Sequence, residues 1–168
     1  MILDLTWKSL PPDLDRSTFD CGIAQLNDYF RKHAGQNHRS RLSVCTVALS
    51  PDESIVGFYT LSAGEIARTS FPPDVIKGLP RYPVPVIRIG QLAVDSKYQG
   101  QGAGKIVLAH ALRTILLNPV YGAVAVVVDS ASDRSTEFFK RHGFVPIADE
   151  KPYTLVTAIK TIEKAFKQ

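Results

Sequence analysis

The hydrophobic and polar positions of this chain follow two periodicities, which together predict a mixture of strands and helices. Short segments in which apolar residues alternate with polar ones, or run without interruption, are typical of strands. These segments are residues 2–8, 43–49, 55–66, 86–94, 123–128, 144–147 and 153–159. Longer segments in which apolar residues recur every three or four positions predict helices with one buried face. These segments are residues 21–34, 104–117 and 133–142, and a short amphipathic tail then runs to Phe166.

Residues with strong local preferences mark the ends of several of these elements. Asp20 and Asp133 stand at the start of helical segments, where a carboxylate accepts hydrogen bonds from the first N–H groups of a helix. Gly143 is expected to end the last long helix in a left-handed conformation. Residues 68–85 contain five prolines, which exclude a regular ladder strand. We therefore predict an ordered but irregular loop there, with one helical turn near Val75.

Length and composition indicate a soluble globular protein. The chain has 168 residues, of which 45% are hydrophobic and 21% charged. We predict a single domain over residues 1–168, with an α/β (α+β mixed sheet) fold. No apolar run approaches the ~18–20 residues that span a membrane, and the N-terminus lacks a secretion signal. Cys21 and Cys45 lack the spacing of zinc ligands, so we expect a cytoplasmic protein with reduced thiols and no metal.

The net charge of +4 is concentrated in two stretches that are poor in acidic residues. One stretch lies between Asp28 and Asp52, and the other between Glu65 and Asp95. Clustered positive charge attracts polyanions by releasing counterions, which favours a nucleic acid or the phosphates of a cofactor as ligand. Solvated surface charge is the alternative for each single residue, and the negative end of a helix dipole also explains two of them. The candidates are Arg31, Lys32, Arg39, Arg41, Arg81 and Arg88, of which Arg31 and Lys32 suit the dipole.

A glycine-rich segment joins the strand at residues 86–94 to the helix that follows it. It reads Gln99-Gly100-Gln101-Gly102-Ala103-Gly104-Lys105, and backbone amides left uncovered at a helix N-terminus are a ready anion site. The Walker A pattern fails, because Gln99 stands at its first glycine and Ile106 at its Ser or Thr. The dinucleotide fingerprint fails as well, because Lys105 stands at its third glycine.

The Gln-x-x-Gly-x-Gly spacing of residues 99–104 resembles the pyrophosphate loop of the GNAT superfamily of N-acetyltransferases, which bind acetyl-CoA. The resemblance implies the GNAT acyl-CoA N-acyltransferase fold, with acetyl-CoA as the cofactor. It also implies that backbone groups of one strand pair with the pantetheine arm, that one of its N–H groups stabilises the oxyanion, and that the loop amides hold the pyrophosphate. A serine in the last long helix is a further candidate contact, with simple hydration of the helix surface equally open. These cofactor-binding candidates are Leu92, Ala93, Val94, Gln99, Gly100, Gln101, Gly102, Ala103, Gly104, Lys105 and Ser135.

Three further segments resemble one branch of this superfamily, the acetyltransferase toxins of type II toxin–antitoxin pairs. They are Phe19-Asp20-Cys21-Gly22 with the Leu26–Phe30 segment after it, the Gly90–Asp95 segment, and the Glu137–Phe144 segment. The resemblance implies a toxin that acetylates the α-amino group of aminoacyl-tRNA and so blocks translation. It also implies a ribbon-helix-helix antitoxin as partner, a homodimer and larger toxin–antitoxin complexes. The basic residues named above then become candidates for tRNA binding.

One position departs from the family pattern. The tyrosine that serves the family as general acid is expected four residues before Gly143, and Phe139 stands there. Phenylalanine has no hydroxyl and cannot donate a proton. The chain is therefore a natively weak enzyme, an enzyme with another donor such as Tyr98 or Tyr153, or an engineered Tyr→Phe form of an active enzyme. The near-isosteric exchange within an intact motif favours the last.

Two other functions remain open on the sequence. An acetyltransferase for a small amine or a protein N-terminus would use the same cofactor loop, without need of the basic region between residues 31 and 41. A catalytically impaired module that binds acyl-CoA or nucleic acid would keep the loop and the charges, with Phe139 as the mark of lost catalysis.

Overall fold

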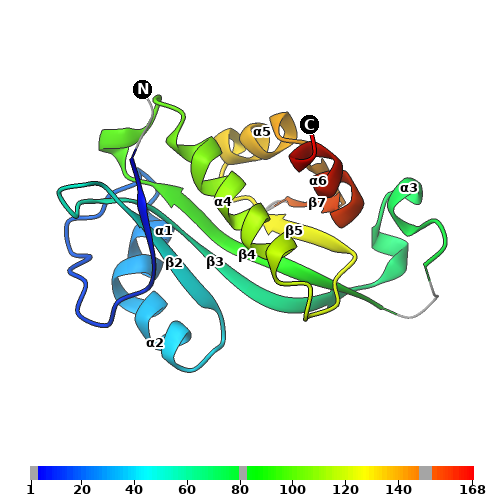
Figure 1. Cartoon of the computed structure of the whole chain (residues 1–168), viewed down its shortest axis with the longest axis horizontal. Helices are drawn as coiled ribbons and strands as arrows, with labels where there is room; N and C mark the ends of the chain where they lie inside the picture. Colours follow the sequence, from blue (N-terminus) through cyan, green and yellow to red (C-terminus); the bar gives the residue numbers. More distant parts are fainter. Residues whose placement is uncertain (1–3, 80–82, 148–152) are drawn as a thin grey trace. The chain divides into compact units, whose positions relative to one another are not determined.

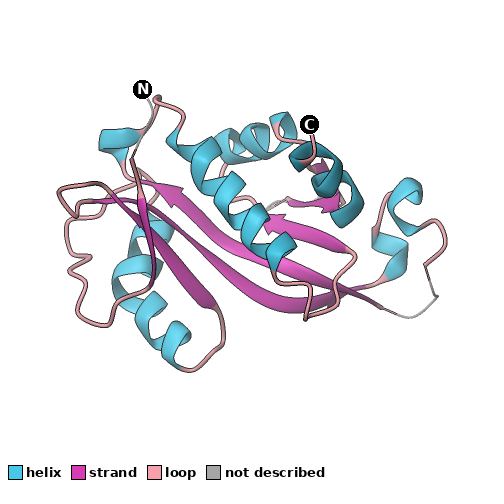
Figure 2. Cartoon of the chain, in the orientation of Figure 1, coloured by secondary structure: helices cyan, strands magenta, loops and turns pink. Residues whose placement is uncertain are grey.

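The computed structural model describes residues 4–79, 83–147 and 153–168 as a mixture of strands and helices (Figures 1 and 2). The hydrogen-bonded strands follow the order β1-β2-β3-β4-β5-β7-β6 in a mixed sheet. The strands are β1 (Thr6–Ser9), β2 (Val44–Leu49), β3 (Ile55–Ile66), β4 (Val84–Val94), β5 (Ala125–Asp129), β6 (Val145–Pro146) and β7 (Thr154–Ala158). The α-helices are α1 (Ala24–Asp28), α2 (Ala34–Arg39), α3 (Pro73–Ile76), α4 (Ala103–Leu117), α5 (Asp133–Arg141) and α6 (Ile159–Phe166). A π-helical segment η1 (Tyr29–His33) and two 3₁₀ turns, η2 (Arg68–Ser70) and η3 (Ser96–Tyr98), complete the described elements.

The chain divides into two compact units, each formed from two stretches of sequence. The first unit comprises Met1–Ser62 and Gly90–Ala111, and the second comprises Ala63–Ile89 and Leu112–Gln168. Strands β3 and β4 and helix α4 contribute residues to both units. The prediction of a single domain over residues 1–168 stays a prediction.

The first unit is built on antiparallel pairing of β1 with β2 and of β2 with β3. Its core contains three aromatic rings that contact one another: Phe30 stacks on Phe58 at 4.1 Å between ring centroids, and Phe19 meets both edge-on. All three side chains are buried. Because these rings come from the N-terminal loop, a helix and a strand, their burial joins all three elements of this unit.

The predicted helix over residues 21–34 is wrong at both ends. The structure has α1, the π-helical η1 and α2 in succession, from Ala24 to Arg39. Asp20 does not cap it: its Oδ1 accepts hydrogen bonds from Gly22 N and Asn27 Nδ2, both at 2.8 Å. The carboxylate therefore stabilises the turn before the helix, which is a local alternative to capping that Asp side chains readily adopt.

The second unit is built around β5, which pairs antiparallel with β7 and parallel with residues 86–89 of β4. The residues of β5 from Ala125 to Val128 are buried, as the continuous apolar run predicts for a strand covered on both faces. The short β6 pairs with β7 at the edge. Helix α3 confirms the helical turn predicted near Val75.

The ends of α5 confirm one prediction and correct another. Gly143 has φ of +90°, the left-handed conformation expected after the helix. The N-cap, however, is Ser132 rather than Asp133: the Ser132 hydroxyl accepts from Ser135 N at 3.1 Å. Asp133 lies in the first turn, where its negative charge favours the helix dipole.

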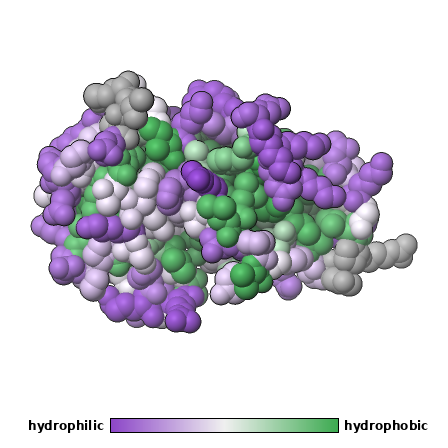
Figure 3. Space-filling view, viewed as in Figure 1, coloured by the Kyte–Doolittle hydropathy of each residue, from purple (hydrophilic) through white to green (hydrophobic). Residues whose placement is uncertain are grey.

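The surface mixes hydrophilic with hydrophobic residues, as the face in Figure 3 shows. Large hydrophobic side chains are exposed at Leu42, Leu117, Val120 and Tyr121. Within the described ranges, no helix combines the length and the apolar character that crossing a membrane requires.

Candidate functional site

Strand β4 continues beyond its pairing with β5. The parallel pairing between them reaches Ile89 and Val128, whereas β4 itself ends at Val94. The sheet order places β5 on that edge of β4, and no other described strand pairs with it there. The backbone groups of residues 90–94 that face this edge therefore remain available for an extended ligand, which binds by adding to a sheet edge, whereas Gln91 N and the Val94 carbonyl are bonded to side chains. Leu92, Ala93 and Val94 lie in this stretch.

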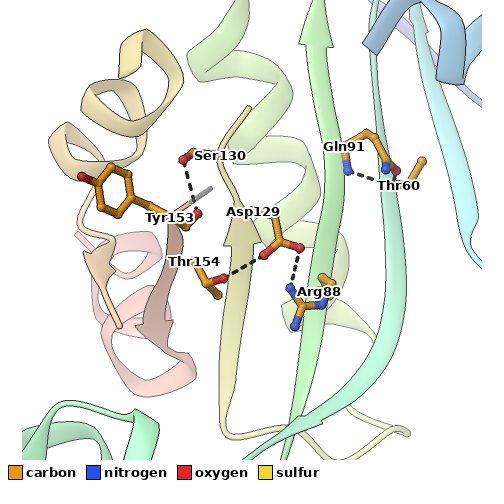
Figure 4. A network of polar contacts seen from close by, with 7 residues as sticks. All are labelled: Thr60, Arg88, Gln91, Asp129, Ser130, Tyr153 and Thr154. Carbon is orange, nitrogen blue, oxygen red and sulfur yellow. Dashed lines mark hydrogen bonds and ion pairs between the residues drawn. The ribbon is translucent and has the colours of Figure 1, made fainter. Parts of the chain in front are cut away.

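A side chain of β3 forms a hydrogen bond with the backbone of β4 where this stretch begins. The Thr60 hydroxyl accepts from Gln91 N at 3.0 Å and donates to Gln91 Oε1 at 2.6 Å (Figure 4). Thr60 is buried, and its Oγ1 lies 3.2 Å from the position that a Cβ on Gly90 would occupy. The backbone N–H of Gln91 is thus satisfied by a side chain rather than by a strand, which marks a local irregularity at the start of the free stretch.

Close approach of β3 to the end of β4 requires a glycine at position 57. A Cβ on Gly57 would lie 2.6 Å from the Ala93 carbonyl oxygen and 3.3 Å from Val107 Cγ2. The absence of a side chain lets the backbone of Gly57 lie directly against the stretch that contains Ala93. The sequence around Gly57 does not distinguish it from any other glycine in a strand, so only the structure shows its role.

The glycine-rich segment forms the turn that leads into α4. Gly100 and Gly102 have φ of +76° and +82°, the left-handed region that side chains disfavour. Helix α4 begins at Ala103, and the N–H groups of Ala103, Gly104 and Lys105 lie in its first turn, where no intrahelical acceptor exists. These amides and the positive end of the helix dipole form an anion site of the kind that binds phosphate.

The side chain of Gln99 holds this turn in place. Its Nε2 donates to the carbonyls of Val94 and Cys21, each at 2.8 Å. Gln99 therefore ties the end of β4 to the N-terminal loop and fixes where the glycines begin. Gln101 makes a similar local bond, from Nε2 to the Lys97 carbonyl at 3.1 Å. Both side chains are engaged with the protein backbone, so it is the backbone of this segment that can receive a ligand.

The N-terminal loop is bonded to the residues between β4 and the glycines. Asp95 is buried; its Oδ2 accepts from Asp20 N at 3.1 Å and its Oδ1 from Lys97 N at 3.0 Å. Ser96 donates to the Asp20 carbonyl from its backbone N at 2.8 Å and from its hydroxyl at 2.9 Å. Asn27 Oδ1 in turn accepts from Cys21 N at 2.8 Å. The two motifs at residues 19–22 and 90–95 thus form one hydrogen-bonded support for the cofactor loop.

Ser135 and Phe139 lie on α5 in the second unit. The Ser135 hydroxyl accepts from Ser132 N at 3.0 Å and Ala131 N at 3.1 Å, which makes it part of a capping box. The predicted cap at Asp133 gives Ser135 no such role, because the capping box requires Ser132 at the N-cap. A contact of Ser135 with the cofactor stays a prediction.

The Phe139 ring is buried among other phenylalanines. It contacts Phe138 and Phe144 edge-on, at 5.3 and 5.6 Å between ring centroids. The Phe139 carbonyl accepts from the N–H groups of His142 and Phe144, which closes the helix. The ring orientation is therefore determined by packing and by the helix end, so a hydroxyl added to this ring has a defined direction.

The predicted basic residues differ in how free their charges are. Lys32 pairs with Asp28 at 3.3 Å, and Arg31 Nη2 donates to the Phe19 carbonyl. Arg39 and Arg41 are exposed, and Arg41 has a positive φ of 60° just after α2. Arg81 lies outside the described residues. Arg31 and Lys32 lie in the last turn of the π-helical η1, and α2 continues the helical segment to Arg39, so the dipole explanation for them stays a prediction.

Arg88 belongs to a polar network of the second unit. Its Nη1 lies 2.5 Å from Asp129 Oδ2, and the Thr154 hydroxyl donates to Asp129 Oδ1 at 3.0 Å, so both side chains point toward this carboxylate (Figure 4). Beside it, Ser130 donates to the Tyr153 carbonyl from its N–H at 3.0 Å. The charge of Arg88 is thus compensated within the protein, which weakens its candidacy as a tRNA contact.

The two cysteines are buried and carry protonated thiols. Burial raises the pKa of the Cys45 thiol to about 12, and burial also raises the pKa of the Cys21 thiol. A thiol with a raised pKa is a poor nucleophile at neutral pH.

Comparison with known proteins identifies the family of this chain. Residues 1–144 match the model of the Acetyltransferase (GNAT) family. The chain belongs to this family. The unpaired stretch of β4, the two left-handed glycines and the open first turn of α4 are therefore features of a GNAT protein.

Relatives and solved structures agree with this membership. The chain is 35% identical to the tRNA-acetylating toxin of Mycobacterium tuberculosis over 147 residues, which cover 87% of each protein. It is 25% identical to the probable toxin TacT of Sinorhizobium fredii over 158 residues, 88% of this chain and 87% of the relative. Among solved structures, AtaT complexed with acetyl-methionyl-tRNAfMet superimposes with a TM-score of 0.86 at 29% identity, over 97% of this chain and 99% of that one. A Tyr-to-Phe mutant of KacT gives a TM-score of 0.88 at 29% identity, over 96% and 99% of the two chains.

These comparisons confirm the predicted mixed α/β fold, the GNAT family and its toxin branch. They also confirm that the chain is of the N-acetyltransferase class. The residue assignments within the site stay predictions, supported by the geometry described above.

Proposed function

We propose that this chain is a toxin that transfers the acetyl group of acetyl-CoA to the α-amino group of aminoacyl-tRNA and so inhibits translation. The observation that carries this proposal is the 35% identity with a tRNA-acetylating toxin over 87% of both chains. The similar AtaT has been solved in complex with acetyl-methionyl-tRNAfMet and, as an antitoxin complex, with acetyl-CoA. The intact cofactor loop and β4 edge support the same activity in this chain.

Acetyl-CoA is held by backbone groups in this proposal. The pyrophosphate binds the amides of the segment Gly100–Lys105, where the helix dipole favours negative charge. The pantetheine arm pairs with the free edge at Leu92–Val94 as an added strand. The cofactor supplies an acetyl group already activated as a thioester, so binding it beside the amine supplies much of the catalysis.

The transfer requires an uncharged amine. The amine nitrogen attacks the thioester carbonyl, a backbone N–H of β4 stabilises the resulting oxyanion, and the C–S bond breaks as the amine loses its proton. A free α-amine has a pKa of roughly 7.7–8.0, so a useful fraction is neutral near pH ~7.5 without a strong base. The leaving thiolate accepts a proton, which is the step that a general acid assists.

We place the general acid of the family at Phe139, where this chain has no hydroxyl. The buried, oriented ring supports that position. Similar structures of AtaT and KacT are Tyr-to-Phe mutants, which supports Phe139→Tyr as the informative substitution. Acetyl transfer by the chain with Phe139 is then slow, because thiolate departs without a donor.

A partner protein accompanies this activity. AtaT has been solved with the C-terminus of the antitoxin AtaR, and we infer that a cognate antitoxin neutralises this chain as well. By resemblance to the family, that antitoxin has a ribbon-helix-helix DNA-binding end, and the toxin forms a homodimer and larger toxin–antitoxin complexes. An enzyme that acts on charged tRNA works in the cytoplasm.

The decisive experiment compares acceptors directly. The Phe139→Tyr form is incubated with labelled acetyl-CoA and with charged tRNA, small amines or peptides with free N-termini. Nuclease digestion and mass spectrometry then identify the acetylated species, with uncharged tRNA as the control. We expect N-acetyl-aminoacyl-tRNA as the main product. Acetylation of amines or peptides alone contradicts the proposed acceptor, and tight CoA binding without any transfer indicates a binding module.

A further inference from the structure

The helical segment of the first unit contains a π-helical turn, which is rare and frequently occurs at functional sites. In η1 the N–H of Ala34 donates to the carbonyl of Tyr29, five residues earlier instead of four. This widened turn contains Arg31 and lies at the start of the basic stretch between Asp28 and Asp52. A backbone carbonyl of this turn accepts a hydrogen bond from an arginine outside the basic stretch.

That arginine is Arg16, on the loop before the helix. Its Nε donates to the Phe30 carbonyl at 2.8 Å, and its guanidinium carbon lies 5.7 Å from the centroid of the Phe30 ring. The helix thus anchors the base of the guanidinium group through one N–H, and the ring attracts its charge. The terminal nitrogens of Arg16 are held in place while other donors remain for a ligand.

A second guanidinium group approaches the same point. A Cβ on Gly35 would lie 3.2 Å from Arg16 Nη2 and 3.3 Å from Arg39 Nη1. Both groups therefore converge over a helical position that has no side chain. The guanidinium groups of Arg16 and Arg39 are both positively charged and repel each other at close range. An anion bound between them would offset this repulsion.

The protein itself does not supply that anion. Among the residues that the structure describes, no carboxylate forms an ion pair with Arg16 or Arg39. Asp15 is adjacent in sequence, but its Oδ1 accepts from the N–H of Ser17 at 2.9 Å and from the Ser17 hydroxyl at 2.7 Å. These hydrogen bonds lower the pKa of Asp15, so it stays charged but turned to its own loop.

An open cavity of about 360 Å³ lies beside Arg16. Its lining includes Arg16 together with Arg31, whose Nη2 donates to the Phe19 carbonyl. Arg16 therefore lies both at this cavity and at the point above the buried Gly35 where Arg39 converges with it. The remaining lining residues are Leu14, Asp15 and Ser17.

We propose that Arg16, Arg31 and Arg39 bind successive backbone phosphates of the RNA substrate, with Arg16 as the central residue. Guanidinium groups form paired, charge-assisted hydrogen bonds with phosphate, and bonds to backbone carbonyls already hold Arg16 and Arg31 in position. An RNA strand carries a phosphate at every nucleotide, so it can contact several arginines at once. A ligand with a single carboxylate cannot. The site rests on the proposed tRNA substrate and adds to it the residues that bind the phosphates of the RNA.

The test measures binding of uncharged tRNA to the chain as it stands, with Phe139, because binding needs no turnover. The variants are Arg39→Gln and Arg16→Gln, and the matched control is Arg113→Gln, an exposed arginine of α4 that loses the same charge. Dissociation constants are measured at several salt concentrations. The affinity for acetyl-CoA is measured in parallel, because it reports whether the cofactor loop and the fold are intact.

We expect each of the two site variants to bind tRNA at least about fivefold more weakly than the parent. We also expect the slope of log K against log salt to fall by about 0.7–0.9, the loss of one phosphate contact. The Arg113→Gln control should stay within about twofold, and all forms should bind acetyl-CoA alike. Arg39→Gln is the cleaner variant, because Arg39 is exposed and its loss leaves the Phe30 carbonyl bond intact.

Unchanged tRNA affinity and slope in both variants overturn the site, even where charged tRNA is acetylated as proposed. The same variants are titrated with an acidic peptide, and loss of its binding with tRNA binding retained also overturns the site and reassigns the arginines to a protein partner. A parent chain that binds no tRNA contradicts the proposed function itself. The first two failures are thus distinguishable from the third.

Discussion

The catalytic question in this chain concerns a single oxygen atom, the hydroxyl that Phe139 lacks. Packing on Phe138 and Phe144 holds the ring, so Phe139→Tyr adds a hydroxyl with little change in shape. We expect acetyl transfer to aminoacyl-tRNA to increase by about a hundredfold, the lower part of what a general acid contributes. Growth toxicity should increase with it.

The measurement is the initial rate of acetylation with both forms at equal concentration. Binding of acetyl-CoA should stay unchanged, since the hydroxyl acts on the departing thiolate rather than on cofactor affinity. Equal rates for the two forms would remove this position from the mechanism and direct attention to another donor.

The buried thiols offer a second test at the residue scale. The pKa of Cys45 is raised to about 12, and that of Cys21 is also raised, so both are protonated at pH 8. Because the thiolate is the reactive form, a thiol reagent should modify neither residue in the folded protein within minutes. Both should react promptly in denaturant. Fast modification of the native chain at pH 8 would show that these residues are not buried as described.

At the scale of elements, the end of β4 depends on its approach to β3. Gly57→Ala places a Cβ 2.6 Å from the Ala93 carbonyl, a backbone atom that cannot rotate away. We expect a loss of about 1–3 kcal/mol in unfolding free energy and weaker acetyl-CoA binding, because the displaced stretch is the one that pairs with pantetheine. Denaturant unfolding and calorimetric titration with acetyl-CoA measure the two effects.

The same strand provides the control. Gly64→Ala introduces the same methyl group on β3, where it would lie 3.7 Å from Val86 Cγ2, an ordinary contact. This variant should bind acetyl-CoA like the parent. Equal cofactor affinity in Gly57→Ala would show that the end of β4 tolerates displacement.

Sequence patterns predicted most helices and strands. The predictions of helix ends were wrong where a polar side chain could form more than one local hydrogen bond. Strand β3 matches the predicted residues 55–66, and α4 begins within one residue of the prediction. The sequence predicts a helix cap at Asp20 because aspartate commonly has that role, yet its carboxylate accepts hydrogen bonds from Gly22 and Asn27 in the turn before the helix. The π-helical turn has no sequence signature, so neither the extension to Arg39 nor the role of Arg16 was visible.

At the scale of the whole molecule, the net charge of +4 makes recognition of a polyanion dependent on salt. We expect acetylation of charged tRNA under subsaturating conditions to fall steeply between 50 and 200 mM salt, on the order of tenfold or more, through counterion release. With acetyl-CoA saturating in both assays, acetylation of a small aminoacyl ester should change little, because this acceptor carries no phosphates. Parallel rate measurements on both acceptors test this, and an equal response of the two would contradict a polyanionic substrate.

The sequence by itself determined the cofactor class and the family. Glycines at fixed spacing after a strand can adopt left-handed turns that few other residues tolerate. The sequence alone therefore predicts a phosphate-binding turn there. The tertiary structure decided which charges are free. Arg88 is neutralised by Asp129, whereas Arg16 and Arg39 converge over Gly35 without a described carboxylate partner. Such pairings join residues far apart in the chain, and only folding brings them within the few ångströms over which charges and hydrogen bonds act.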